Sequence, residues 1–339
     1  MAKINPTNTV LDKVQDFVSR YVQVGDDEKL VIGLWILHTW TFSESVPNPY
    51  TTPYLYVHSA ERRSGKTRLL EVTETLVRNP LRAANATSAV LFRSFELLSP
   101  TLLLDEVDAI WSGAKNEEMR GVLNAGYKRG GSVLRVEDKE PKAFNCFAPK
   151  ALAGIDNGQL PDTVRDRCIP IHMHRQKEGS SEAFYSFDVE DEVFALTAEI
   201  GDWIISEYPK VAGERPKPIE GISDRAWEIS MPLIALAHWF GPEIVKKTKA
   251  ALKRLLTVEE TLSPTEQLLA DIRDLFEEMK SNTLPADLIV ERTGLSSGKL
   301  LANMLRPHGP KPTVVRFRGQ GVRGYYKRDF TPAWERHLS

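Results

Sequence analysis

The sequence has few of the features that mark membrane, secreted or metal-stabilised proteins. Only two of its 339 residues are cysteines, Cys146 and Cys168, and their spacing fits neither a disulfide framework nor a zinc motif. There is no run of about 18 apolar residues, so we expect no membrane span. The apolar stretch 31–40 is short and begins too late for a secretion signal. These absences predict a cytoplasmic protein.

The chain also lacks an overall excess of one charge, because 44 Lys and Arg face 46 Asp and Glu, a net of −2. The charges are unevenly placed, however. From residue 299 onward nine basic residues face two acidic ones, a net of +7. Such asymmetry predicts a surface for nucleic-acid phosphates; the alternative is a solvated surface that contacts proteins. The basic residues are Lys299, Arg306, Lys311, Arg316, Arg318, Arg323, Lys327, Arg328 and Arg336.

Residues 59–67, Ser-Ala-Glu-Arg-Arg-Ser-Gly-Lys-Thr, approximate the phosphate-binding pattern G-x-x-x-x-G-K-[ST]. Such a loop directs backbone N–H groups at phosphates from the N-terminus of a helix. Lys66 would reach the β- and γ-phosphates, and the Thr67 hydroxyl would coordinate Mg²⁺. Ala60 replaces the first glycine, at a cost of roughly 1–2 kcal/mol if a positive φ is needed. A β-prone run, 53–57, precedes the loop, and helical spacing follows at 68–77. The predicted nucleotide-binding residues are Ala60, Glu61, Arg62, Arg63, Ser64, Gly65, Lys66 and Thr67.

Two acids, Asp105 and Glu106, follow the apolar run 101–104. That run suits a buried parallel strand, whose carboxyl end would face the phosphate crevice. Asp105 would hold Mg²⁺ through water, and Glu106 would activate the attacking water. The alternative is an acid pair that caps the next helix. With the loop, these acids predict ATP and Mg²⁺ as cofactors.

The pattern from Tyr54 to Met173 resembles the additional-strand ATPases of the AAA+ type. This resemblance implies a parallel sheet flanked by helices, a polar sensor residue and an arginine supplied by a neighbouring subunit. A further buried strand is predicted at 150–155, and Asn157 after it is the candidate sensor, with Asp156 or a simple turn as alternatives.

The segment 160–171 predicts a short helix that carries two arginines, followed by another strand. The resemblance makes Arg167 the candidate trans arginine, with Arg165 second. The alternative for both is a local salt bridge with Asp162 or Asp166.

The chain beyond this core predicts a helical lid. Residues 188–208 have helical periodicity, and 223–240 form a mainly apolar helix with Ser223 as a candidate N-cap. The resemblance implies an arginine over the γ-phosphate in the first turn of such a lid helix, and Arg225 matches it. A solvated arginine at a helix start is the alternative.

The last segment predicts three helices, at 263–279, 285–293 and 296–306, and then a hairpin at 313–326. This is the order of a winged helix, a helix-turn-helix variant. The candidate nucleic-acid contacts within it are Lys299, Arg306, Arg316, Arg318 and Arg323.

A second basic cluster, Lys128 and Arg129, precedes Gly130-Gly131 and the run 132–136, which together predict a hairpin. Hexameric translocases carry pore loops in this part of the chain, so contact with a nucleic-acid backbone is one interpretation. A surface hairpin at a subunit interface is the other.

A narrower resemblance extends along nearly the whole chain. It is to the DUF3631 family of phage- and mobile-element-borne predicted helicases, with remote similarity to MCM-type replicative ATPases. Besides the loop, the motifs that carry it are His38-Thr-Trp40, the segment 82–93, Leu103-Leu-Asp-Glu-Val-Asp108, Ala151-Leu-Ala-Gly-Ile155, Leu160-Pro-Asp-Thr163, Asp166-Arg167, Asp224-Arg225 and the segment 324–334.

Together these patterns predict an α/β protein with an AAA+ P-loop ATPase core, a helical lid and a C-terminal winged helix. The expected domains are an N-terminal helical segment (1–50), the core (51–175), the lid (176–262) and the winged helix (263–339). We expect Mg²⁺-dependent ATP hydrolysis coupled to DNA translocation, unwinding or remodelling, in a homo-oligomer such as a hexameric ring. If the chain is phage-encoded, the compartment is the cytoplasm of the bacterial host. The alternatives are an ATP-gated DNA-binding or assembly module with slow or no hydrolysis, and an ATPase that remodels proteins.

Overall fold

The computed structural model describes residues 9–59, 63–84, 88–110, 116–137, 139–156, 160–175, 181–257, 264–295, 297–317 and 319–337. The chain divides into two compact units, residues 1–257 and 258–339.

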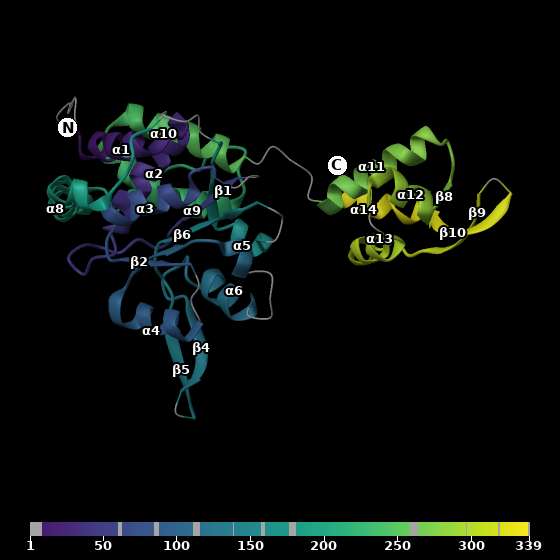
Figure 1. Ribbon diagram of the computed structural model, residues 1–339, viewed down its shortest axis with the longest axis horizontal. Coiled ribbons are helices and arrows are strands. Elements are labelled where there is room, and N and C mark those ends of the chain that lie inside the picture. Colours follow the sequence, from purple (N-terminus) through teal and green to yellow (C-terminus); the bar gives the residue numbers. More distant parts are fainter. Residues whose placement is uncertain are drawn as a thin grey trace. The chain divides into compact units, whose positions relative to one another are not determined.

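Unit 1 is an α/β fold built on a five-stranded parallel sheet flanked by helices (Figure 1). The strand order is β2-β3-β6-β1-β7. Its apolar strands are buried, which explains why two of them, β3 and β6, begin and end at the residues that the sequence predicts. The strands are β1 (Tyr54–Ser59), β2 (Pro80–Ala83), β3 (Thr101–Leu104), β6 (Lys150–Ile155) and β7 (Cys168–His172).

The position of β6 determines which loops meet at one edge of the sheet. β6 pairs with β1 on one side and with β3 on the other, and Leu152 is in register with both Tyr56 and Leu104. Because all three strands are parallel, the segments that follow them emerge at the same edge. The loop after β1 and the acids after β3 are therefore separated by one strand.

Helices cover this sheet and extend its core. α3 packs against β1 and β6, α5 against β6, and α10 against β7. The N-terminal helices α1 and α2 share the same core, and the Trp35 indole N–H donates to the Pro53 carbonyl at 2.9 Å. The helices are α1 (Val10–Tyr21), α2 (Asp26–Thr39), α3 (Lys66–Leu76), α4 (Ser88–Leu98), α5 (Val107–Ile110), α6 (Asn116–Ala125), α7 (Asp162–Arg165), α8 (Glu190–Glu207), α9 (Asp224–Trp239) and α10 (Pro242–Leu256).

A two-stranded hairpin, β4 (Ser132–Glu137) and β5 (Glu140–Asn145), extends away from the sheet (Figure 1). The sequence prediction placed a hairpin at Gly130-Gly131, but these glycines precede β4, and Lys139 with φ 69° lies in the turn. Gly131 is needed for a close approach instead, because a Cβ there would lie 1.8 Å from the Ala125 carbonyl oxygen.

The base of this hairpin is held by a buried lysine at the start of β6. The Lys150 ammonium donates to the carbonyl oxygens of Cys146 (2.8 Å), Ala148 (2.9 Å) and Gly126 (3.3 Å). It also lies 4.8 Å from the centroid of the Tyr54 ring. Burial lowers the pKa of Lys150 to about 7. Its three acceptors use all three N–H groups of the ammonium form.

Unit 2 has its own apolar core and a three-stranded antiparallel sheet in the order β8-β10-β9. Three helices precede the hairpin, as the sequence predicts, and Ser297 caps α13 by accepting from the Leu300 N–H. The prediction missed β8, which is only three residues long. The elements are α11 (Pro264–Glu278), β8 (Thr283–Pro285), α12 (Ala286–Thr293), α13 (Gly298–Leu305), β9 (Thr313–Phe317), β10 (Gln320–Tyr326) and α14 (Thr331–His337).

Across the described residues of both units, every helix is too short or too polar to cross a lipid bilayer.

Candidate active site

The loop after β1 leads directly into α3, and its described part has the backbone of a tight turn. Gly65 is the N-cap of α3 with φ 88°, and Arg63 has φ 61°. As a glycine, Gly65 has no side chain with which to cap this helix end. The N–H groups of the first turn therefore point toward the loop, where an anion can accept from them. Ala60, Glu61 and Arg62, the other predicted loop residues, lie outside the described residues.

Lys66 lies in the first turn of α3, and its ammonium contacts two serine hydroxyls. Nζ donates to Ser59 Oγ at 2.6 Å and to Ser64 Oγ at 3.2 Å, and Ser64 Oγ donates to Ser59 Oγ at 2.8 Å. Burial lowers the pKa of Lys66, while the charges of Asp108 and Asp105 oppose that change. The negative charges of the segment after β3 thus act on the pKa of this lysine. Thr67, the predicted Mg²⁺ ligand, follows it with an exposed side chain.

Asp105 and Glu106 occupy the carboxyl end of β3, as predicted. Asp105 is 8% exposed, and its carboxylate lies 3.8 Å from the Arg82 guanidinium. Glu106 is exposed, and its backbone has φ 54°, with its N–H donating to Asp105 Oδ1 at 3.0 Å. A positive φ is uncommon in a residue other than glycine, and such backbone conformations concentrate at functional sites.

Asp108 is a further acid at this edge, to which the sequence reasoning gave no role. Its Oδ1 accepts the Ile155 N–H at 3.1 Å, which joins the start of α5 to the end of β6. A Cβ on Gly154 would lie 2.8 Å from the same oxygen, so the approach needs glycine there. No cluster of three or more His, Cys, Asp or Glu side chains in the described ranges could hold a metal ion. A divalent cation here would need phosphate and water oxygens as well, which is the usual arrangement for Mg²⁺.

Asp156, the alternative sensor, follows β6 and contacts two side chains. Arg165 Nη2 donates to its Oδ1 at 3.0 Å, and His58 Nδ1 lies 3.4 Å from its Oδ2. Burial lowers the pKa of His58 to about 4, so the ring is neutral at pH 7. Arg165 therefore pairs with Asp156, whereas the sequence had suggested Asp162 or Asp166. Asn157, the first choice of sensor, lies outside the described residues.

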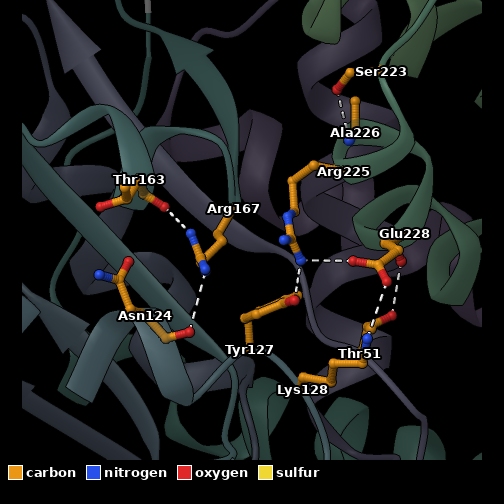
Figure 2. Close-up of polar contacts among 10 residues, drawn as sticks. All are labelled: Thr51, Asn124, Tyr127, Lys128, Thr163, Arg167, Ser223, Arg225, Ala226 and Glu228. Carbon is orange, nitrogen blue, oxygen red and sulfur yellow. Dashed lines mark hydrogen bonds and ion pairs between the residues drawn. The ribbon is translucent and has the colours of Figure 1, made fainter. Parts of the chain in front are cut away.

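Arg167 and Arg225 lie together around Tyr127 (Figure 2). Each guanidinium carbon is 4.7 Å from the centroid of the Tyr127 ring. Cation–π contacts of this kind contribute about 0.5–2 kcal/mol each. Ser223 caps α9 as predicted, since its side chain accepts from the Ala226 N–H, and this cap sets the first turn from which Arg225 projects. No sequence pattern points to Tyr127.

These two arginines are at the opposite end of β1 from Lys66. The Arg167 carbonyl accepts the N–H of Tyr54, the first residue of β1, whereas Lys66 contacts Ser59, the last. Five residue steps at about 3.3 Å give roughly 16 Å between these ends. Within one chain the structure therefore does not bring Arg225 or Arg167 to the loop.

Lys128 and Arg129, the predicted pore contacts, precede the β4–β5 hairpin. Lys128 Nζ lies 3.1 Å from Glu228 Oε1, and Arg129 Nε donates to the Pro49 carbonyl at 3.1 Å. Lys128 is thus paired with α9, and Arg129 with the segment before β1. The strands of the hairpin instead expose the apolar Leu134 and Val136, which are 68% and 76% exposed.

Four predicted nucleic-acid contacts in unit 2 are exposed cations. Arg316 lies on β9 and Arg323 on β10, diagonally across the hairpin and on its outward face, because Val315 and Val322 pair on the inward face. Lys299 is in α13, and Arg306 follows it. In the part of unit 2 that the structure describes, none of these four forms an ion pair. Arg318 lies outside the described residues.

Comparison with known proteins bears out the expected family resemblance for the second half of the chain. The family model described as "Protein of unknown function (DUF3631)" matches residues 172–337. That stretch includes Arg225 and unit 2, but it begins after Lys66, Asp105, Glu106 and Arg167. A solved structure described as "The A form apo structure of NrS-1 C terminal region-CTR" is similar over 96% of this chain and 77% of that chain, with 14% sequence identity and a TM-score of 0.48. No curated protein matches the chain.

Proposed function

We propose that this protein is a Mg²⁺-dependent ATPase of the AAA+ type that acts as a homo-oligomer and couples hydrolysis to translocation, unwinding or remodelling of DNA. The observation that carries the proposal is the convergence of Lys66 with Asp105 and Glu106 at one edge of the sheet. Lys66 is held at the uncapped start of α3, and the Asp105 charge acts on its pKa. The position of β6 between β1 and β3 supports the proposal, because this class has an additional strand at that place.

The residues at this edge suit each step of phosphoryl transfer. The N–H groups of α3 and the Lys66 ammonium would bind the β- and γ-phosphates. Thr67 and Asp105 would hold Mg²⁺, which neutralises negative charge on the phosphates when bound. Glu106, exposed on its positive-φ backbone, would accept a proton from the attacking water. Arg167 and Arg225, at the other end of β1, would serve the site of a neighbouring copy.

The features of unit 2 support the proposal that DNA is the partner. Its three helices, antiparallel sheet and exposed hairpin cations fit a winged helix that contacts phosphates. The β4–β5 hairpin of unit 1 is a second candidate contact. Exposed apolar side chains on that hairpin equally suit an interface between copies.

The test is ATP turnover by the purified full chain with and without single- and double-stranded DNA. We expect Mg²⁺-dependent turnover that DNA stimulates and EDTA abolishes. Glu106→Gln should retain ATP binding and lose at least 100-fold in kcat, while Lys66→Ala should lose ATP binding. No wild-type turnover in any condition would favour the ATP-gated assembly module, and turnover indifferent to DNA would favour a protein-remodelling ATPase.

A further inference from the structure

Tyr127 contacts both Arg167 and Arg225. It is 7% exposed and lies between α6 and β4. Its ring faces both guanidinium groups, and its hydroxyl accepts from Arg225 Nη1 (Figure 2). Two arginines from distant parts of the chain thus share one neutral aromatic partner.

The other partners of the two arginines restrain them only in part. Arg167 donates to the Asn124 carbonyl at 3.2 Å and to the Thr163 carbonyl, and Arg225 donates to Glu228 Oε2 at 2.7 Å. Two positive charges near each other repel, so both need negative potential close by. The face of the tyrosine ring supplies it to both.

Tyr127 is itself held firmly by backbone contacts. Its carbonyl accepts the Thr52 N–H at 2.8 Å, and the next residue, Lys128, forms a β-bridge with Thr51. The Thr51 hydroxyl donates to the Glu228 carbonyl at 2.7 Å, which joins this segment to α9. The tyrosine therefore offers both arginines a fixed surface at the amino end of β1.

We propose that Tyr127 is the positioning residue that aims Arg167 and Arg225 at the nucleotide of a neighbouring copy. This inference rests on the proposed function. Removal of the ring should lower kcat for ATP and leave nucleotide binding by the variant's own loop unchanged, because Lys66 lies at the far end of β1.

The first experiment compares two substitutions of Tyr127 with a matched control in the full chain. Tyr127→Phe keeps the ring and loses the hydroxyl bond to Arg225, so kcat should fall about threefold. Tyr127→Leu loses the ring as well, so kcat should fall tenfold or more, with the Kd for Mg·ATP within twofold of wild type. Tyr185→Leu, at a tyrosine that is 55% exposed and contacts Phe187, should leave kcat unchanged.

The second experiment mixes two impaired variants. Tyr127→Leu keeps an intact loop, and Lys66→Ala keeps intact arginines, so an equimolar mixture should form interfaces that join the two intact halves. Random mixing makes one interface in four fully intact, so we expect at least twofold more turnover per protomer in the mixture than in either variant alone.

The outcomes separate the two proposals. Wild-type kcat in both Tyr127 variants overturns the positioning role, and so does loss of turnover without recovery on mixing. If Tyr127→Leu does not fold, Tyr127→Phe alone is the test. An unchanged kcat in Tyr127→Phe then overturns the positioning role. Absence of wild-type turnover overturns the proposed function, and the positioning role falls with it.

Discussion

A single buried histidine, His38, makes the stability of unit 1 depend on pH. It is 1% exposed, its Nε2 lies 2.9 Å from Thr52 Oγ1, and burial lowers its pKa to about 3. Between pH 6.5 and 3 the unfolded chain therefore binds a proton at this residue that the folded chain does not.

We predict that the free energy of unfolding falls by about 2 kcal/mol between pH 7 and pH 5 because of this residue. Urea unfolding at the two pH values measures the change. His38→Gln has no charge to gain and should show a correspondingly smaller fall. An equal fall in wild type and variant would contradict the assignment to His38.

Some residues of the candidate site can be predicted from the sequence, and others cannot. The positions of Lys66, Asp105 and Glu106 follow from local patterns, since each stands at the end of an apolar strand or at the start of a helix. Tyr127 has no such signature, because its partners are 40 and 98 positions away. The pairing of Arg165 with Asp156 was missed for a different reason: the two are only nine positions apart, but Asp162 and Asp166 are nearer in the sequence, and the fold selects Asp156.

Among the secondary-structure elements, the β9–β10 hairpin gives the most specific prediction about DNA binding. We predict that Arg316→Ala with Arg323→Ala weakens binding to duplex DNA at least tenfold. It should also reduce the slope of log K against log salt by about 2, one per lost phosphate contact. Fluorescence anisotropy with a labelled duplex over a salt series measures both quantities.

Arg292 provides the matched control for this pair. It lies in the same unit, in α12, and forms an ion pair with Glu278. Arg292→Ala should therefore leave affinity and salt slope close to wild type. A double variant that kept the wild-type slope would exclude the hairpin as the phosphate-contacting surface.

Elements were predicted best where burial dictates the pattern. β3 and, after Lys150, β6 are mainly apolar runs, so the sequence indicates where these strands lie. The β4–β5 turn was misplaced because two glycines suggested it; Gly130 does have a positive φ, but it precedes β4, and the turn between the strands contains Lys139, whose φ is also positive. β8 was not predicted because a three-residue strand has too little periodicity and is defined only by its pairing with β10.

At the scale of the whole molecule, the described residues form two separate apolar cores. Unit 2 buries large side chains of its own, among them Phe276, Tyr325 and Phe330. We predict that residues 258–339 alone unfold cooperatively, with a Tm in the range of about 45–65 °C. Thermal circular dichroism measures this, and a gradual change without a transition would show that the unit needs the rest of the chain.

The buried ammonium of Lys150 has a consequence for how this sequence can change over generations. A Cβ on Gly126 would lie 2.5 Å from Lys150 Nζ and 2.2 Å from the Cys146 carbonyl oxygen. Any side chain at position 126 therefore displaces the ammonium, and a smaller residue at 150 removes the donor that the Cys146 and Ala148 carbonyls share, while the Gly126 carbonyl keeps the Ala148 N–H at 3.2 Å. We therefore expect natural selection to act on the two positions together, and on the hairpin whose base they hold.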